Sequence, residues 1–230
     1  NLSLYRQYYG QWKTSGCKSA VVDDAIIPWR KVFLECPKSS ENMYLDGLKI
    51  MNYKMKKAAE EDKSAYVDTI VRIYKQRMEY FPTKKSGKNQ IGNIKGRLGV
   101  KLYQIAPDRC SEAYEYLKES VAMEQDNASV SSIVFYFRAT IKKVKKGQAE
   151  ETLIVDTYDE LMTLIETNID DNQDNAKKLA SWENAQGNVE KTFEPYATCD
   201  ALVGIYDKKF AETPNDIELL KKITKILKKK

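Results

Sequence analysis

Apolar residues recur every three or four positions along most of the chain, and this spacing places them on one face of an α-helix. Two of the clearest stripes consist of Leu4, Tyr5, Tyr8, Tyr9 and Trp12, and of Ile154, Tyr158, Leu161, Ile165 and Ile169. No segment shows a convincing alternation of apolar and polar residues, which is typical of a half-buried strand. The pattern therefore predicts an all-α protein without a β-sheet.

Polar stretches, glycines and prolines divide these stripes into about eleven predicted helices. The expected ranges are 4–12, 20–36, 40–58, 61–81, 91–107, 109–124, 129–146, 151–169, 174–192 and 196–212, with a last helix near the carboxyl end. The links between them are short, so consecutive helices should run antiparallel as hairpins. One hairpin has too little apolar surface to form a core, and we therefore expect the hairpins to stack side by side.

Residues at the helix ends refine these predictions. Pro28 lies inside the second predicted helix and indicates either a kink there or a helix that begins nearby. Asp108 is the expected N-cap of the sixth helix. Asn215 and Glu218 have the spacing of a capping box, which would open the last helix. The apolar residues of that last helix that we expect to face inward are Leu220, Ile223 and Leu227.

The fifth predicted helix contains three glycines, and a polar loop precedes it. Gly92, Gly96 and Gly99 leave one face of that helix nearly bare, so that a neighbouring backbone can come close. The polar, glycine-containing stretch at 83–91 is the clearest predicted loop of the chain. We expect one domain over residues 1–230, in which this loop separates the sub-blocks 1–82 and 92–230.

A nine-residue pattern occurs three times, as WRKVFLECP at 29–37, YKQRMEYFP at 74–82 and YDKKFAETP at 206–214. Each copy begins with an aromatic residue, has a large apolar residue four positions later, and ends with a proline. Residues four positions apart share one face of a helix, and proline cannot extend the helix because it has no N–H group. We interpret the three copies as the ends of helical hairpins.

These hairpins resemble the tetratricopeptide-repeat family, whose unit of about 34 residues has two helices, with alanine and an aromatic residue in the second helix and a proline after it. The matching residues are Ala25, Trp29 and Pro37 in one repeat, and Leu98, Gly99, Ala113, Leu117 and Ser120 in another. Tyr206 and Pro214 match only the closing part of the repeat motif. Residues 127–195 match the family motif poorly, and their assignment depends on periodicity alone. The resemblance implies a right-handed α-solenoid.

Three longer segments are also similar to exported tetratricopeptide-like proteins of Bacteroidetes-type bacteria. These segments are NLSLYRQYY, IIPWRKVFLECP and TFEPYATCDALVGIYDKKFAETP. The resemblance implies a location in the cell envelope or periplasm after removal of a signal peptide. The cysteines leave the cytoplasm open as the alternative, because Cys17, Cys36, Cys110 and Cys199 could remain thiols or form disulfides in three pairings.

Composition narrows the chemistry. The chain has no histidine, which excludes Ser-His-Asp triads, Cys-His dyads and histidine-ligated metals. No two cysteines form a CxxC motif, and no apolar run approaches the ~20 residues that span a bilayer. We therefore expect a protein that is not an enzyme, holds no cofactor or metal and has no transmembrane segment. The net charge of +5 is mild, and the lysine-rich carboxyl end is best interpreted as a solvated helix.

Two short segments resemble ligand-binding loops but lack their essential residues. GKNQIGN at 87–93 is followed by isoleucine, so that Asn93 and Ile94 stand where a phosphate-binding loop needs lysine and then serine or threonine. Counted from Asp170, the start of DDNQDN at 170–175, the sixth residue is Asn175 and the twelfth is Ser181, where a calcium loop needs glycine and glutamate. We interpret the two segments as a polar loop and a break between helices.

We expect a scaffold that binds a protein or peptide partner in a groove formed by the first helices of its hairpins. The candidate partner-binding residues are Lys49, Asn52, Tyr53, Lys101, Tyr136, Arg138, Trp182 and Asn184. The opposing interpretation is that the aromatic members belong to the core and the lysines are simply solvated. The alternative function is a nucleic-acid-binding helical solenoid that uses its basic surface, although we expect neither nucleic acid nor a small molecule as the main ligand.

Overall fold

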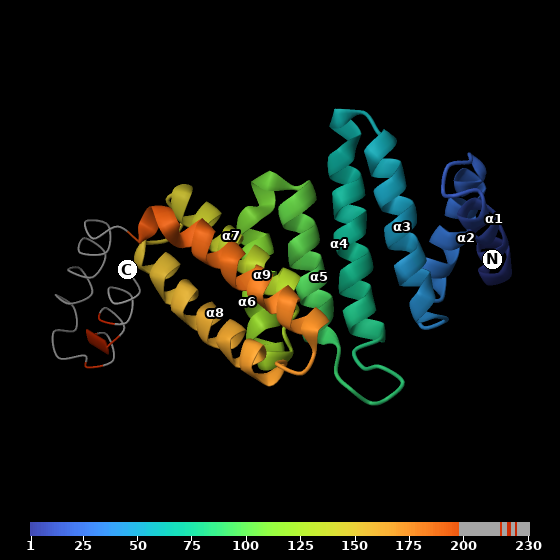
Figure 1. Ribbon diagram of the computed structural model, residues 1–230. Coiled ribbons are helices and arrows are strands. Elements are labelled where there is room, and N and C mark those ends of the chain that lie inside the picture. Colours follow the sequence, from blue (N-terminus) through green and yellow to red (C-terminus); the bar gives the residue numbers. More distant parts are fainter. Residues whose placement is uncertain (198–216, 218–219, 222–223, 225–230) are drawn as a thin grey trace. The chain divides into compact units, whose positions relative to one another are not determined.

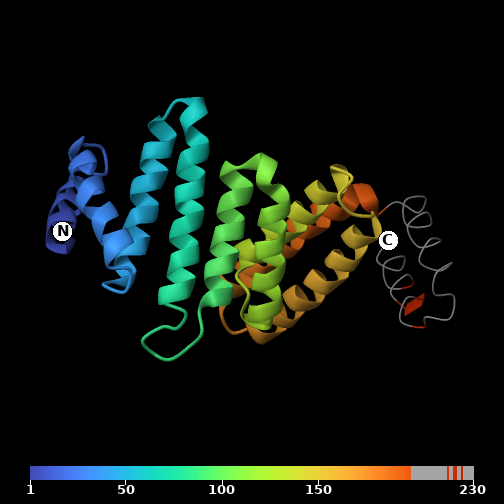
Figure 2. The ribbon, with the colours of Figure 1, turned by 180° about the vertical axis from the view of Figure 1, so that it is seen from behind.

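The structure is a computed structural model, and it describes residues 1–197 together with residues 217, 220, 221 and 224. Figures 1 and 2 show the helices from opposite sides. Residues 1–197 form nine α-helices and four short 3₁₀ helices, and the described residues contain no strand apart from an isolated bridge between Thr83 and Asn89. The predicted all-α class is confirmed.

Each of the nine α-helices overlaps a range that periodicity predicted. Their bounds are α1 (Leu2–Thr14), α2 (Val21–Glu35), α3 (Glu41–Lys57), α4 (Lys63–Tyr80), α5 (Ile91–Ile105), α6 (Cys110–Glu124), α7 (Val130–Lys145), α8 (Thr152–Asp171) and α9 (Ala176–Phe193). The 3₁₀ helices are η1 (Glu60–Asp62), η2 (Pro107–Arg109), η3 (Gln125–Asn127) and η4 (Glu194–Tyr196). Helical stripes therefore located these elements to within a few residues.

The predictions near the carboxyl end fall mostly outside the described residues. These are the helix 196–212 beyond residue 197, the capping pair Asn215 and Glu218, and the inward positions Ile223 and Leu227. The count of eleven helices therefore stays a prediction. Leu220 is described, and its side chain is 44% exposed instead of facing inward.

The chain divides into two compact units, Asn1–Leu98 and Gly99–Lys230. The boundary lies within α5, whereas the sequence placed a division at the polar loop 83–91. In the first unit α1 packs against α2 and α3 packs against α4. In the second unit α6 packs against α7, α8 packs against α9, and α7 also contacts both α8 and α9. Helices that follow one another in the sequence are thus paired within each unit.

Aromatic side chains join α2 and α3 in the first unit. Trp29 and Phe33, from the first copy of the nine-residue pattern, are both buried and stack with ring centroids 5.0 Å apart. Phe33 meets Tyr44 edge-on at 5.8 Å. The indole N–H of Trp29 donates a hydrogen bond of 2.9 Å to the carbonyl of Met43. Gly47 lies against the same indole, and a Cβ atom placed there would be only 2.3 Å from the Trp29 ring.

The bare face predicted for α5 is confirmed at Gly99, in the second unit. A Cβ atom at Gly99 would lie 2.5 Å from the side chain of Leu117 and 3.0 Å from the carbonyl oxygen of Ala113. Both residues belong to α6, so the absence of a side chain at Gly99 lets the two helices approach closely. These three residues are among those that carry the resemblance to the repeat family.

One prediction about a helix boundary is wrong. Asp108 does not cap α6, because it lies inside the 3₁₀ turn η2 and Arg109 occupies the N-cap position without a side-chain hydrogen bond. Pro107 at the start of this turn favours the tighter geometry. Of the two alternatives at Pro28, the structure excludes a helix that begins nearby, since α2 starts at Val21 and continues through this residue.

Candidate functional site

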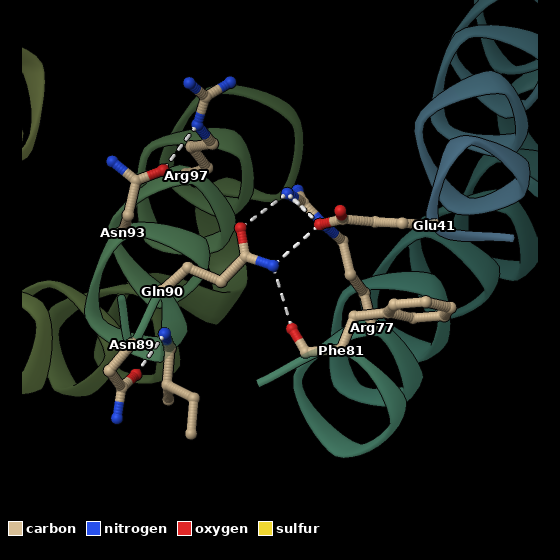
Figure 3. A network of polar contacts seen from close by, with 8 residues as sticks. Glu41, Arg77, Phe81, Asn89, Gln90, Asn93 and Arg97 are labelled. Atoms are coloured by element: carbon tan, nitrogen blue, oxygen red, sulfur yellow. Dashed lines mark hydrogen bonds and ion pairs between the residues drawn. The ribbon is translucent and has the colours of Figure 1, made fainter. Parts of the chain in front are cut away.

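A network of polar contacts lies at the end of α4 in the first unit (Figure 3). The Glu41 Oε1 atom accepts hydrogen bonds from Arg77 Nε at 3.1 Å and from Arg77 Nη2 at 3.0 Å. The Gln90 Nε2 group donates to the same oxygen at 2.7 Å and to the carbonyl of Phe81 at 2.9 Å. The Gln90 Oε1 atom accepts from Arg77 at 3.4 Å. We call Glu41, Arg77, Gln90 and the Phe81 carbonyl the Arg77 network.

The positions of these residues in their helices favour the network electrostatically. Glu41 lies in the first turn of α3, where the helix dipole stabilises negative charge. Arg77 lies in the last turn of α4, where it stabilises positive charge. Arg77 and Gln90 are only 7% and 4% exposed, so the network removes a guanidinium group and an amide from water while providing them with partners.

The Arg77 network fixes a hairpin-shaped loop, residues 82–90, which connects α4 to α5 (Figure 1). Within it, the Gln90 N–H donates to the Pro82 carbonyl at 2.9 Å, and the Lys84 N–H donates to the Lys88 carbonyl at 2.8 Å. Gly87 forms the tip with a φ of +81°, a conformation that glycine adopts without strain. We call residues 82–90 the basic hairpin, since its lysines, Lys84, Lys85 and Lys88, are all exposed.

Sequence reasoning found the loop but missed the network that holds it. The partners are far apart in the chain, with 36 positions between Glu41 and Arg77 and 49 between Glu41 and Gln90. No local motif links them. The one signal in the sequence was the cluster of three lysines in a predicted loop without an acidic residue.

An open hollow with a volume of about 490 Å³ lies on the second unit. It is lined by Val121, Ala122, Gln125, Asp126, Glu160, Thr163 and Leu164, which come from α6, η3 and α8. Partial burial raises the pKa of the Glu160 carboxyl above its usual value, and the charge of the nearby Lys118 opposes this shift. The hollow therefore combines apolar walls with two carboxyl groups.

The backbone is strained at one edge of this hollow. Gln125 has a φ of 47° and a ψ of −123°, a combination that non-glycine residues rarely adopt. We expect Gln125→Gly to raise the free energy of unfolding of the second unit by about 1 kcal/mol. Glycine adopts this conformation without strain, and the larger conformational entropy of the unfolded chain offsets only part of that stabilisation. Chemical denaturation followed by circular dichroism would measure the change. Asp126→Gly is the control, and an equal gain there would contradict the assignment of strain to Gln125.

The predicted partner-binding residues of the first unit lie together on α3. Lys49 is exposed beside Asp46. Burial raises the pKa of the Asp46 carboxyl above its usual value, and the hydrogen bond with Tyr9 and the Lys49 charge offset only part of this shift. Asn52 is half-buried, and its Nδ2 group donates to the Leu48 carbonyl at 2.6 Å. Tyr53 packs edge-on against Trp12 at 5.2 Å, so it helps to join α3 to α1. Of these three residues, Lys49 is the most accessible to a partner.

The predicted residues of the second unit separate into buried and accessible groups. Tyr136 and Trp182 are 2% and 7% exposed and belong to the core, which supports the core interpretation of these two aromatic residues. Arg138 is half-buried and donates to Asn188 Oδ1 at 3.3 Å, Asn184 is exposed, and Lys101 is half-buried. Arg138, Asn184 and Lys101 therefore remain candidates for partner contact.

The described residues give no sign of a metal or a membrane-spanning site. No group of three or more potential metal-ligating side chains occurs among them. None of the helices in this part of the chain has the length and apolar character needed to cross a bilayer. Cys17, Cys36 and Cys110 are free thiols, whereas Cys199 lies outside the described residues.

Comparisons with known proteins identify no relative of this chain. Protein-family models, curated proteins and solved structures all give no match to the chain. The resemblance to tetratricopeptide repeats therefore stays a hypothesis that depends on the quoted residues.

Proposed function

We propose that this chain is a non-catalytic scaffold that binds a protein or peptide partner through its helical hairpins. The observation that carries the proposal is the pairing of consecutive helices in both units, α1 with α2 and α3 with α4 in the first, and α6 with α7 and α8 with α9 in the second. Paired helices of this kind bury one face and leave an extended face for another polypeptide. Such a face is larger than a small metabolite needs.

The finer architecture in this proposal is a right-handed, tetratricopeptide-like α-solenoid. It is supported by the tight packing of Gly99 against Ala113 and Leu117, because the family resemblance assigns a small residue to this position. The accessible candidates Lys49, Arg138 and Asn184 have suitable chemistry for a peptide. Asparagine binds main-chain groups, and lysine and arginine bind carboxylates.

We also propose that the protein works in the bacterial cell envelope or periplasm, as the resemblance to exported proteins implies. Fractionation of native cells tests this location independently of the partner. Recovery of the protein in the periplasmic or envelope fraction would support export, and a substantial cytosolic pool would refute it.

Photo-cross-linking in native cells tests the partner class. A photoreactive amino acid at Lys49 or Asn184 is expected to give discrete protein adducts, since both side chains are exposed on helices of the two units. The control position is Glu61, which is exposed in the 3₁₀ turn between α3 and α4. Adducts with nucleic acid alone would favour the alternative function, and equal labelling at all three positions would remove the proposed binding face.

A further inference from the structure

We infer that the basic hairpin, residues 82–90, is a preformed docking element for an acidic segment of a protein partner. The hairpin contributes three exposed lysines, and the sequence from Phe81 to Gln90 contains no acidic residue. Three ammonium groups on one short turn attract carboxylates and repel other basic segments. The inference deepens the proposed scaffold function, on which it rests, by stating the chemistry of the partner.

Buried polar groups hold the hairpin in place. Gln90 uses its amide to bind both Glu41 and the Phe81 carbonyl, at 2.7 and 2.9 Å (Figure 3). Asn89 adds a second fixed point, because its side-chain oxygen accepts from the Ile91 N–H at 2.8 Å at the start of α5. The two ends of the connection are therefore held together, and the hydrogen bond from the Lys84 N–H to the Lys88 carbonyl closes the turn that carries the lysines.

Fixing the hairpin before binding has a direct advantage. A flexible loop loses conformational entropy when it binds, and a loop that is already ordered avoids most of that loss. Exposed ion pairs are individually weak, so a binding element made of three lysines depends on such preorganisation. This accounts for an ordered polar loop that has no extensive apolar packing of its own.

The distribution of charge favours an acidic polypeptide over nucleic acid. Nucleic-acid binders neutralise several successive phosphates with a long basic stripe. Here the lysines are confined to positions 84–88, and the exposed Glu79 lies in the last turn of the preceding helix. A short run of carboxylates matches this compact positive surface better than a long polyanion does.

Binding of two labelled probes to the full chain tests the inference. The probes are a peptide of alternating aspartate and glutamate and an oligouridylate of the same length, measured by fluorescence anisotropy at low and moderate salt. The triple variant K84E/K85E/K88E is expected to bind the peptide at least tenfold more weakly. The control K145E/K146E/K177E changes the net charge equally at three exposed lysines of the second unit and should weaken binding by less than threefold.

Two further variants separate a preformed site from simple charge attraction. Gln90→Met removes the amide while keeping the side-chain length, and Gly87→Val strains the turn, yet both retain all three lysines. Each is expected to weaken peptide binding about threefold to tenfold while circular dichroism shows an intact fold. Unchanged affinity in both variants, equal loss in the two charge-reversal variants, or tighter binding of the oligouridylate would each overturn the inference.

The outcomes also separate this inference from the proposed function. Cross-linking to a protein partner combined with no peptide binding at the hairpin would refute the inference and leave the scaffold function standing. Peptide binding as expected, combined with no protein adduct in cells, would refute the scaffold function and leave the chemistry of the hairpin intact.

Discussion

Trp29→Ala is expected to lower the free energy of unfolding of the first unit by about 4 kcal/mol, as for other buried aromatic residues. Trp29 is 1% exposed, stacks on Phe33 at 5.0 Å, and fills the space over Gly47. Its loss would create a cavity between α2 and α3 and would leave the Met43 carbonyl without its 2.9 Å hydrogen bond. Urea denaturation followed by circular dichroism measures the change.

Gly47 supplies an internal control for this result. Alone, Gly47→Ala should destabilise the unit by about 2 kcal/mol, because the new Cβ would lie 2.3 Å from the Trp29 ring. In the Trp29→Ala background the same change should instead stabilise by about 1 kcal/mol, since alanine favours a helix more than glycine does. Simple additivity of the two substitutions would show that this contact is absent in solution.

Arg77→Ala is expected to lower the free energy of unfolding of the first unit by about 3 kcal/mol. The Arg77 side chain is 9% exposed and donates two hydrogen bonds to one oxygen of Glu41. Without it, the buried Gln90 loses a hydrogen-bond donor, and the partly exposed Glu41 carboxylate loses its ion pair. Denaturation measures the stability, and hydrogen exchange of residues 81–90 should accelerate because the base of the basic hairpin is released.

Arg72→Ala is the matched control for Arg77. Arg72 belongs to the same helix and is exposed, with its guanidinium group 5.7 Å from the Phe33 ring centroid. A cation–π contact at an exposed position contributes about 0.5–1 kcal/mol, so this variant should lose little stability and keep the hairpin protected. Equal destabilisation by the two variants would mean that the Arg77 network has no special role.

Local patterns in the sequence determined the secondary structure because helices depend on residues a few positions apart. The three-to-four-residue spacing located all nine described helices, and the first copy of the nine-residue pattern identified Trp29 and Phe33 as packing residues. The glycine at position 99 indicated a close helix contact correctly. The cap assigned to Asp108 failed because a 3₁₀ turn that begins with Pro107 competes with a capped helix start, and both patterns are local.

Tertiary structure alone decided which polar side chains meet. The Arg77 network joins residues 36 and 49 positions apart, and periodicity contains no information about which helix faces which. The same limit explains why the sequence left Tyr136 and Trp182 open to a place in the core or on a binding surface, whereas the structure buries both. Sequence by itself thus determined that the chain forms helical hairpins and a lysine-rich loop. Only the packing of α3 against α4 decided that this loop is held by a buried arginine, because the residues that meet there are neighbours in space and not along the chain.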